Sequence, residues 1–245
     1  MRFSIGSPTS SDGVIERLFT LGEIPGVLWT PEGASGIRPL ILMGHGGGQH
    51  KKASRIVAGA RRFAVECGFA AMAIDAPGHG DRPKTAELDR AFTEMRTRAA
   101  NGEPMFPLVA GLHTLLAEQA VAEWHSVLDA VAGLEDVGDG PVGYLGMSLG
   151  CGLGVPLVAA EPRIRAAVLG LFGALGLAGA AARITVPVQF VMQWDDERVP
   201  RQEALALFDA FASAEKTLHA NPGKHGDVPV FETESSLGFF TRHLG

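Results

Sequence analysis

From residue 39 onward, short segments that are apolar throughout alternate with segments that have the amphipathic spacing of helices. A strand that is apolar on both sides needs both faces of its sheet covered, as in parallel sheets joined by crossover helices. The apolar segments are 39–48, 69–80, 141–148, 165–173 and 186–196. The helical segments are 54–68, 113–132, 149–162, 201–213 and 234–245. This alternation predicts an α/β fold with a mostly parallel, doubly wound sheet and helices on both faces.

The N-terminal region and the size of the chain also bear on its architecture. Two strand-like runs, 14–21 and 24–31, are separated by a Gly-Glu pair, which predicts an antiparallel hairpin ahead of the parallel region. A length of 245 residues and a hydrophobic content of 46% suit one globular domain over residues 1–245. The net charge of −6 argues against a nucleic-acid partner, which normally requires a basic surface.

Cysteine usage and the N-terminal sequence predict a cytoplasmic location. Cys67 and Cys151 lack CxxC spacing, so we expect neither a disulfide nor a zinc site. The first residues lack the basic and apolar regions of a secretory signal. The uncharged stretch 166–181 is shorter than the roughly 20 residues of a membrane helix. We interpret this stretch as a buried strand that runs into a loop, and we expect no membrane partner.

Glycines surround Ser148 in the run PVGYLGMSLGCGLG, residues 141–154. The pentapeptide GMSLG has the pattern Gly-x-Ser-x-Gly, which is a weak signal on its own in a chain with 32 glycines. Its context is more specific, because it lies between a buried strand and a helix of small residues. This is the strand–turn–helix setting of a nucleophile elbow, so Ser148 is the candidate nucleophile.

A serine hydroxyl reacts only when a base removes its proton and an acceptor orients that base. Asp195 and Asp196 follow one apolar segment, and His225 lies in a loop after the strand-like segment at 216. Because parallel strands end at one edge of a sheet, we expect these side chains to converge on the serine. His219, within that strand-like segment, and His243, in the closing helix, are expected to be structural or exposed.

With the order serine, acid, histidine, the chain resembles the α/β-hydrolase superfamily over nearly its full length, and in particular its serine esterase and dienelactone-hydrolase-like members. The resemblance implies a catalytic triad of Ser148, Asp196 and His225. Members of the superfamily commonly carry G-x-x-D-x-x-V-P at the acid. The segment QWDDERVP matches from its second aspartate, with Gln193 in place of the glycine. This register favours Asp196, and Asp195 remains the alternative.

The glycine cluster GHGGG, residues 44–48, follows an apolar segment. The resemblance implies that the backbone N–H groups of Gly47 and Leu149 form an oxyanion hole, with Gly46 or Gly48 as alternates to Gly47. A phosphate-binding loop is the competing interpretation. It fits poorly, because QHKK follows the glycines where a P-loop has Gly-Lys-Ser/Thr.

Other polar residues near these motifs have structural interpretations. His45 and His79 resemble positions that brace loops beside the site in the superfamily. The sequence contains no HExxH motif, so we expect no metal and no cofactor. Lys51 belongs to a group of basic residues that start or face a helix, and we expect a solvated charged surface there.

Residues 83–112 have no counterpart in the strand–helix alternation. The segment reads as an amphipathic helix carrying Leu88, Phe92 and Met95, followed by a proline-containing loop. Members of the superfamily often place a lid after this strand, so we expect 83–112 to be a small lid insertion within the domain. The expected substrate-binding side chains are Phe92, Met105, Phe106 and Trp194.

The resemblance implies a serine hydrolase, and specifically a carboxylesterase that cleaves an ester or lactone through an acyl-enzyme. A thioesterase or peptidase with the same triad is the alternative reaction. A catalytically silent protein that binds a hydrophobic ligand is the alternative of another class. The expected partner is a small ester-type substrate, with the protein a monomer or a homodimer.

Overall fold

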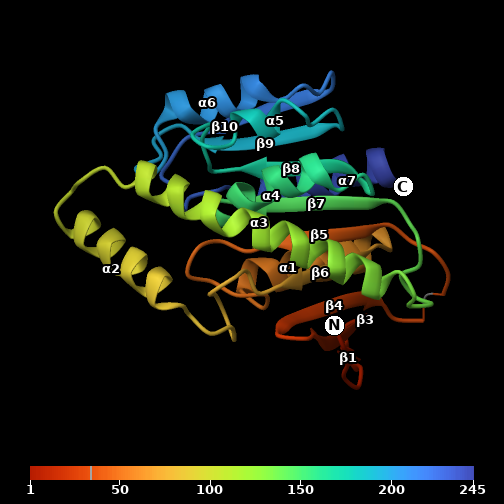
Figure 1. Ribbon diagram of the computed structural model, residues 1–245. Coiled ribbons are helices and arrows are strands. Elements are labelled where there is room, and N and C mark those ends of the chain that lie inside the picture. The colour runs from red at the N-terminus through yellow and green to blue at the C-terminus, as the bar shows by residue number, and fades with distance from the viewer. Residues whose placement is uncertain (34) are drawn as a thin grey trace.

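Residues 1–33 and 35–245 are described by a computed structural model (Figure 1). In this part of the chain, ten strands form one sheet in the order β1-β3-β4-β6-β5-β7-β8-β9-β10, with β2 paired to β3. The strands from β6 to β10 are parallel, and β4, β3 and β1 continue the sheet antiparallel. The strands are β1 Phe3–Ile5, β2 Thr9–Ser11, β3 Val14–Leu21, β4 Ile24–Pro31, β5 Leu40–Gly44, β6 Ala70–Ile74, β7 Val142–Met147, β8 Ile164–Gly170, β9 Val188–Gln193 and β10 Lys216–Asn221. The predicted α/β class with a mostly parallel sheet is confirmed.

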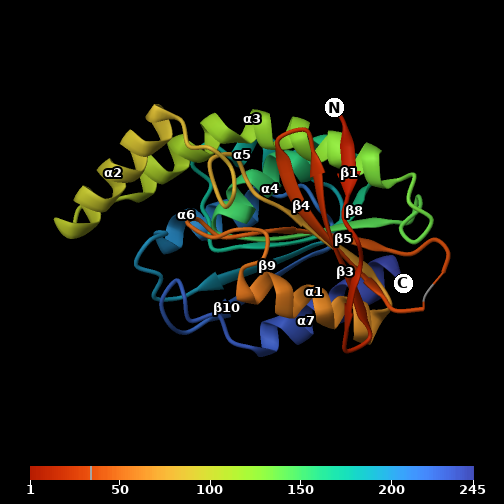
Figure 2. The same ribbon diagram turned by 90° about the horizontal axis from the view of Figure 1, so that it is seen from below.

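Helices cover both faces of this sheet (Figure 2). Helices α1 and α7 pack on one face, where Phe63 and Phe240 belong to one apolar cluster. Helices α3 and α4 pack on the other face, over a cluster that includes Trp124 and Tyr144. The helices are α1 Ser54–Cys67, α2 Ala86–Ala100, α3 Phe106–Val131, α4 Leu149–Ala160, α5 Ala178–Ala181, α6 Arg201–Ala210 and α7 Phe231–Leu244. This two-sided cover explains why the parallel strands are apolar throughout.

The N-terminal hairpin has the predicted bounds, because β3 and β4 span 14–21 and 24–31 and pair antiparallel. The short strands β1 and β2 extend the sheet beyond β3 and were not expected from the sequence. Each has three residues, and those of β2 are all exposed. Their pairing with β3 depends on backbone groups, which leave no pattern of side chains in the sequence.

The long helix α3 begins at Phe106 and not at residue 113, so the predicted loop over residues 106–112 is wrong. Pro107 lies in the first turn of α3, where N–H groups have no partner within the helix, and proline is therefore tolerated. The stretch 166–181 likewise ends in the short helix α5 where only a loop was expected. Among the described residues, no helix combines the length and the apolar character needed to cross a membrane.

Glycines allow helix α4 to lie directly against strands β5 and β7. A Cβ atom on Gly150 would come too close to the backbone of Gly44 in β5, and one on Gly154 would overlap the ring of Tyr144 in β7. Tyr144 is buried, and its hydroxyl donates a hydrogen bond of 2.6 Å to the Gly150 carbonyl. The glycines that follow Ser148 therefore serve close packing, and they place the start of α4 at the edge of the sheet.

The substitution Gly154→Ala should destabilise the protein by about 1–3 kcal/mol, because the added methyl group must displace the buried ring of Tyr144. Gly111→Ala is the matched control, since no atom lies within 4 Å of a Cβ built on this exposed position of α3. The control should gain up to about 1 kcal/mol from helix propensity. Urea denaturation followed by circular dichroism measures both changes, and equal midpoints for the two variants would contradict this account of the packing.

Candidate active site

Ser148 occupies the sharp turn between β7 and α4. Its backbone has φ 56° and ψ −117°, a conformation that is strained for a residue with a side chain and costs about 1–3 kcal/mol. The Ser148 N–H donates a 2.9 Å hydrogen bond to the Gly170 carbonyl at the end of β8. The turn is thus held from the neighbouring strand, and the Ser148 hydroxyl faces a cavity.

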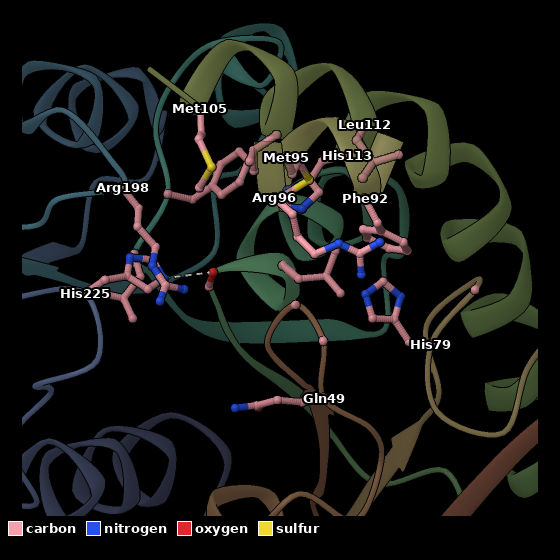
Figure 3. Close-up of a pocket in the computed structure, with 18 of the residues that line it drawn as sticks. Gln49, His79, Phe92, Met95, Arg96, Met105, Leu112, His113, Arg198 and His225 are labelled. Carbon is pink, nitrogen blue, oxygen red and sulfur yellow. Dashed lines mark hydrogen bonds between the residues drawn. The ribbon is translucent and has the colours of Figure 1, made fainter. Parts of the chain in front are cut away.

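His225 connects Ser148 to Asp196. Its Nε2 lies 3.0 Å from Ser148 Oγ, and its Nδ1 lies 2.8 Å from Asp196 Oδ2. Asp196 is a carboxylate acceptor, so Nδ1 carries the hydrogen and Nε2 is free to accept the serine hydroxyl proton. The three side chains come from the loops after β7, β9 and β10, and they meet at the carboxyl edge of the parallel strands. Figure 3 shows His225 at the cavity.

The two adjacent aspartates have different environments. The side chain of Asp196 is 5% exposed, and its Oδ1 accepts hydrogen bonds from the backbone N–H groups of Arg198 (2.8 Å) and Val199 (3.0 Å). Burial alone would raise the pKa of Asp196, but the hydrogen bonds from His225 and these amides outweigh burial and lower it. Asp195 is 65% exposed and lies 3.8 Å from Arg201. The structure therefore brings Asp196 to His225 and leaves Asp195 in solvent.

A further carboxylate, Glu197, was not identified from the sequence. Its Oε2 accepts a 3.0 Å hydrogen bond from the backbone N–H of His225. This contact joins the loop after β9 to the loop after β10, and it fixes the backbone of the histidine. No sequence pattern could identify this role, because Glu197 lies within the acid motif and its partner is a main-chain group.

The backbone amides expected to form an oxyanion hole lie at the same cavity. Gly47 and Leu149 both line it, and among the described residues neither N–H donates a hydrogen bond. The alternate Gly46 is already engaged, because its N–H donates to Gln49 Oε1 at 3.3 Å. The other alternate, Gly48, has a left-handed backbone with φ 72° and also lines the cavity.

A buried ion pair anchors the loop that holds Gly47. Lys51 Nζ lies 2.8 Å from Asp75 Oδ2, and the side chains of the two residues are 8% and 0% exposed. The backbone N–H groups of Lys51 and Asp81 also donate to Asp75, at 2.7 and 3.0 Å. The expectation that Lys51 lies on a solvated surface is wrong. The sequence could not reveal this pairing, because the partner follows a different strand.

His45 and His79 lie in these same two loops. His45 Nε2 accepts a 3.0 Å hydrogen bond from the Ala76 N–H, and burial lowers the pKa of His45 to about 4. Burial also lowers the pKa of His79, whose Nδ1 donates to the Pro77 carbonyl at 3.0 Å. Both imidazoles are therefore neutral at pH 7. Within residues 1–33 and 35–245, no group of three or more His, Cys, Asp or Glu side chains is placed to hold a metal ion.

A cavity of about 610 Å³ opens beside Ser148 and His225. Three of the expected substrate-binding side chains line it, namely Phe92 from α2, Met105 before α3 and Phe106 in α3. Figure 3 shows Phe92 and Met105. Trp194 does not line the cavity, so that expectation is wrong. The indole ring is 44% exposed and lies 4.0 Å from the guanidinium carbon of Arg201, because strand β9 ends before it and turns it outward.

Other cavity-lining side chains were not found from the sequence. They come from the inner face of α3 and from the loop after β8, and they are Val109, Leu112, His113, Leu171 and Phe172. Helical and strand periodicity mark these residues as buried. Periodicity does not distinguish a residue that faces a cavity from one that faces the core.

Solved structures similar to this chain extend over its full length. A cold-adapted esterase from an Arctic intertidal metagenomic library is 36% identical, with 100% of both chains covered and a TM-score of 0.81. The acetyl xylan esterase from Paenibacillus sp. R4 is 16% identical, with 99% of this chain and 88% of that chain covered and a TM-score of 0.71. The dienelactone hydrolase from Anabaena variabilis is 20% identical, with 92% and 95% covered and a TM-score of 0.62. No protein-family model matches the sequence, and a search of the curated proteins gave no match.

The stability contributed by Asp196 should depend on pH. A carboxyl group whose pKa is lowered by folding stabilises the folded state above its ordinary value near 3.8, and this contribution is lost as the pH falls. The difference in unfolding free energy between wild type and Asp196→Asn should therefore be largest above about pH 5 and shrink toward pH 3. Asp195→Asn, at the exposed neighbour, should match wild type throughout a denaturation series. A difference in unfolding free energy between wild type and Asp196→Asn that did not change with pH would contradict the lowered pKa of Asp196.

Proposed function

The chain belongs to the α/β-hydrolase superfamily, and on this premise we propose that it is a carboxylesterase with Ser148 as nucleophile, His225 as general base and Asp196 as the residue that orients the base. The observation that supports the proposal is the continuous set of hydrogen bonds from Ser148 Oγ through His225 to Asp196 Oδ2, at 3.0 and 2.8 Å. A neutral imidazole placed in this way can take the serine proton as the hydroxyl attacks a carbonyl carbon.

The reaction proceeds in two steps with proton transfer through His225. In the first, Ser148 Oγ bonds to the ester carbonyl carbon, and His225 passes the serine proton to the leaving alcohol as the C–O bond breaks. In the second, water attacks the acyl-enzyme, gives its proton to His225 and releases the carboxylic acid, and Ser148 regains its proton. Asp196 stabilises the imidazolium that forms in each step.

The N–H groups of Gly47 and Leu149 stabilise the negative oxygen of each tetrahedral intermediate. Both amides are free of other partners in the described part of the chain, so they need not break a bond to accept the oxyanion. Leu149 is also the first residue of α4, whose N-terminal partial positive charge adds to the stabilisation. The ion pair of Lys51 with Asp75 positions the loop of Gly47.

We assign the segment 83–112 the role of a lid over the substrate cavity. It comprises α2, the connection to α3 and the first turns of α3, and it contributes Phe92, Met105 and Phe106 to the cavity wall. Phe106 is 5% exposed and makes an edge contact with Phe172, with ring centroids 5.6 Å apart. The large apolar wall suits the hydrocarbon part of an ester.

Removal of either Ser148 or His225 tests the proposed function. Ser148→Ala and His225→Ala should each lower kcat for 4-nitrophenyl acetate by a factor on the order of 10⁴ or more, and the double variant should be no slower, because the two side chains act as one unit. A fluorophosphonate probe should label wild type at Ser148, as read by peptide mass spectrometry.

Asp195→Asn is the matched control, and it should retain both turnover and labelling. Independent, multiplying losses in the double variant would contradict the triad. A wild-type protein that is neither labelled nor active would indicate a ligand-binding protein. Turnover of thioesters or peptides in preference to esters would reassign the reaction while keeping the nucleophile.

Shortening Phe106 tests the lid. Phe106→Ala should enlarge the cavity and shift the optimum of kcat/KM in a series of 4-nitrophenyl acyl esters toward longer chains, by about 1–3 kcal/mol of discrimination. Leu115→Ala is the control on the same helix, because Leu115 is 54% exposed and does not line the cavity. A folded Phe106→Ala variant with an unchanged optimum would show that substrate length is selected elsewhere.

A further inference from the structure

The wall of the substrate cavity contains a buried histidine that the proposed reaction does not use. His113 of α3 is 6% exposed and stacks on Phe172, with ring centroids 4.7 Å apart and planes at 20°. Burial lowers the pKa of His113 to about 3, so the imidazole is neutral at pH 7. A neutral polar ring at this depth loses its hydrogen bonds to water and needs a partner from elsewhere.

The surroundings of His113 determine which ring nitrogen carries the hydrogen. Nδ1 is buried without a hydrogen-bond partner among the described residues, and it lies against Gly152 of α4, where a Cβ atom would overlap it. An N–H at Nδ1 would therefore have no acceptor. Nε2 differs from Nδ1, because only Nδ1 of this ring is a fully buried atom that lacks a hydrogen-bond partner. The favoured tautomer carries its hydrogen on Nε2, and His113 lines the cavity. His113 thus offers the cavity an uncharged N–H donor.

Arg96 of α2 adds a positive charge to the same cavity. Figure 3 shows its guanidinium group directed into the cavity, near Phe92 and His79. The side chain of Arg96 is exposed, and its one hydrogen bond to another described side chain is to Thr93 Oγ1, at 3.1 Å. Arg96 forms no ion pair with a described carboxylate. The single acidic side chain among the described cavity residues is Asp89, which also borders the outer groove of α2 with Arg90.

A second arginine of the cavity, Arg198, has a different setting. Its Nε lies 3.3 Å from Glu197 Oε1, and its side chain is 59% exposed. Its backbone N–H is also bonded to Asp196. Arg198 is therefore partly neutralised beside the triad, whereas the charge of Arg96 has no counterpart in the described structure. Lys84 is a further exposed cation at this cavity, 5.7 Å from the Phe92 ring centroid, so the wall around α2 carries positive charge without an ion-pair partner in the described structure.

We propose that Arg96 and His113 form a subsite for a carboxylate group on the substrate, separate from the ester that Ser148 attacks. Arg96 provides the charge and two directed N–H donors, and His113 provides the N–H of Nε2. The apolar side chains between this subsite and Ser148 contact the hydrocarbon that joins the two groups. The substrate class is then an ester that carries a free carboxylate, such as a half-ester of a dicarboxylic acid. This inference rests on the proposed esterase function.

Matched pairs of esters with and without the carboxylate test the subsite. One pair is 4-nitrophenyl hydrogen suberate and 4-nitrophenyl methyl suberate, which differ only by a methyl cap on the acyl side. The other is 3-acetoxybenzoic acid and its methyl ester, with the carboxylate on the alcohol side. In at least one pair the carboxylate should lower KM by about tenfold, as expected for hydrogen bonds to a charged group.

Variants of the two subsite residues should reduce this preference. Arg96→Gln and His113→Phe should each bring the KM ratio of the responsive pair toward one, mainly by raising KM for the carboxylate. Arg90→Gln is the matched control, because Arg90 lies on the same helix beside the outer groove and does not line the cavity. It should keep the wild-type ratio.

Binding to Ser148→Ala, measured by calorimetry with the same pairs, gives a readout that does not require turnover. Tighter binding of the carboxylate that is lost on adding Arg96→Gln would support the subsite even if the hydrolysis assignment failed. Hydrolysis of the neutral esters without any preference for the carboxylate in either pair would overturn the subsite and leave the esterase proposal intact. If Arg90→Gln lost the preference for the carboxylate-bearing ester to the same extent, the preference would be a general effect of surface charge and the subsite would be ruled out.

Discussion

The direct contact between helix α4 and strands β5 and β7 is the constraint on which the candidate site depends. Gly44 and Gly150 let the two backbones approach without intervening side chains, and the hydroxyl of Tyr144 is bonded to the Gly150 carbonyl. A helix held this close can begin only after a very sharp turn, and Ser148 lies in that turn with a positive φ. The surrounding packing thus maintains a backbone strain that would otherwise relax, and it presents the hydroxyl at the sheet edge.

Around this turn, hydrogen bonds already engage most of the polar groups. Both carboxylate oxygens of Asp196 have partners, Asp75 accepts from Lys51 and Asp81, and the His45 ring is neutral between backbone groups. The backbone N–H groups of Gly47 and Leu149 face the cavity and donate no hydrogen bond within the described part of the chain. Such preorganisation favours electrostatic catalysis, because the donors need not reorient when negative charge develops.

The cavity differs from the triad in how it is built. Its wall combines residues of the segment 83–112 with residues from the loop after β8, and most are apolar. Against that background the neutral His113 and the unpaired Arg96 are exceptions. Neither stabilises the fold through an ion pair in the described structure, and a buried imidazole without a partner costs free energy. A carboxylate at the cavity would accept a hydrogen bond from His113 Nε2 and bind the cation of Arg96, which is the physical basis of the proposed subsite.

The α/β class, the hairpin at 14–31 and the strand–turn–helix setting of Ser148 could be predicted from the sequence, because each depends on local periodicity or on a local turn motif. The sequence also placed Asp196 and His225 in loops at strand ends, but it left Asp195 as an alternative. The folded chain was needed to choose between the two aspartates, to show that Trp194 points outward and to show that Lys51 is buried against Asp75. These outcomes depend on where each strand stops and on which distant loop lies opposite it. Such non-local contacts leave no periodic signal in the sequence, and the positions of His113 and Arg96 at the cavity could not be predicted for the same reason.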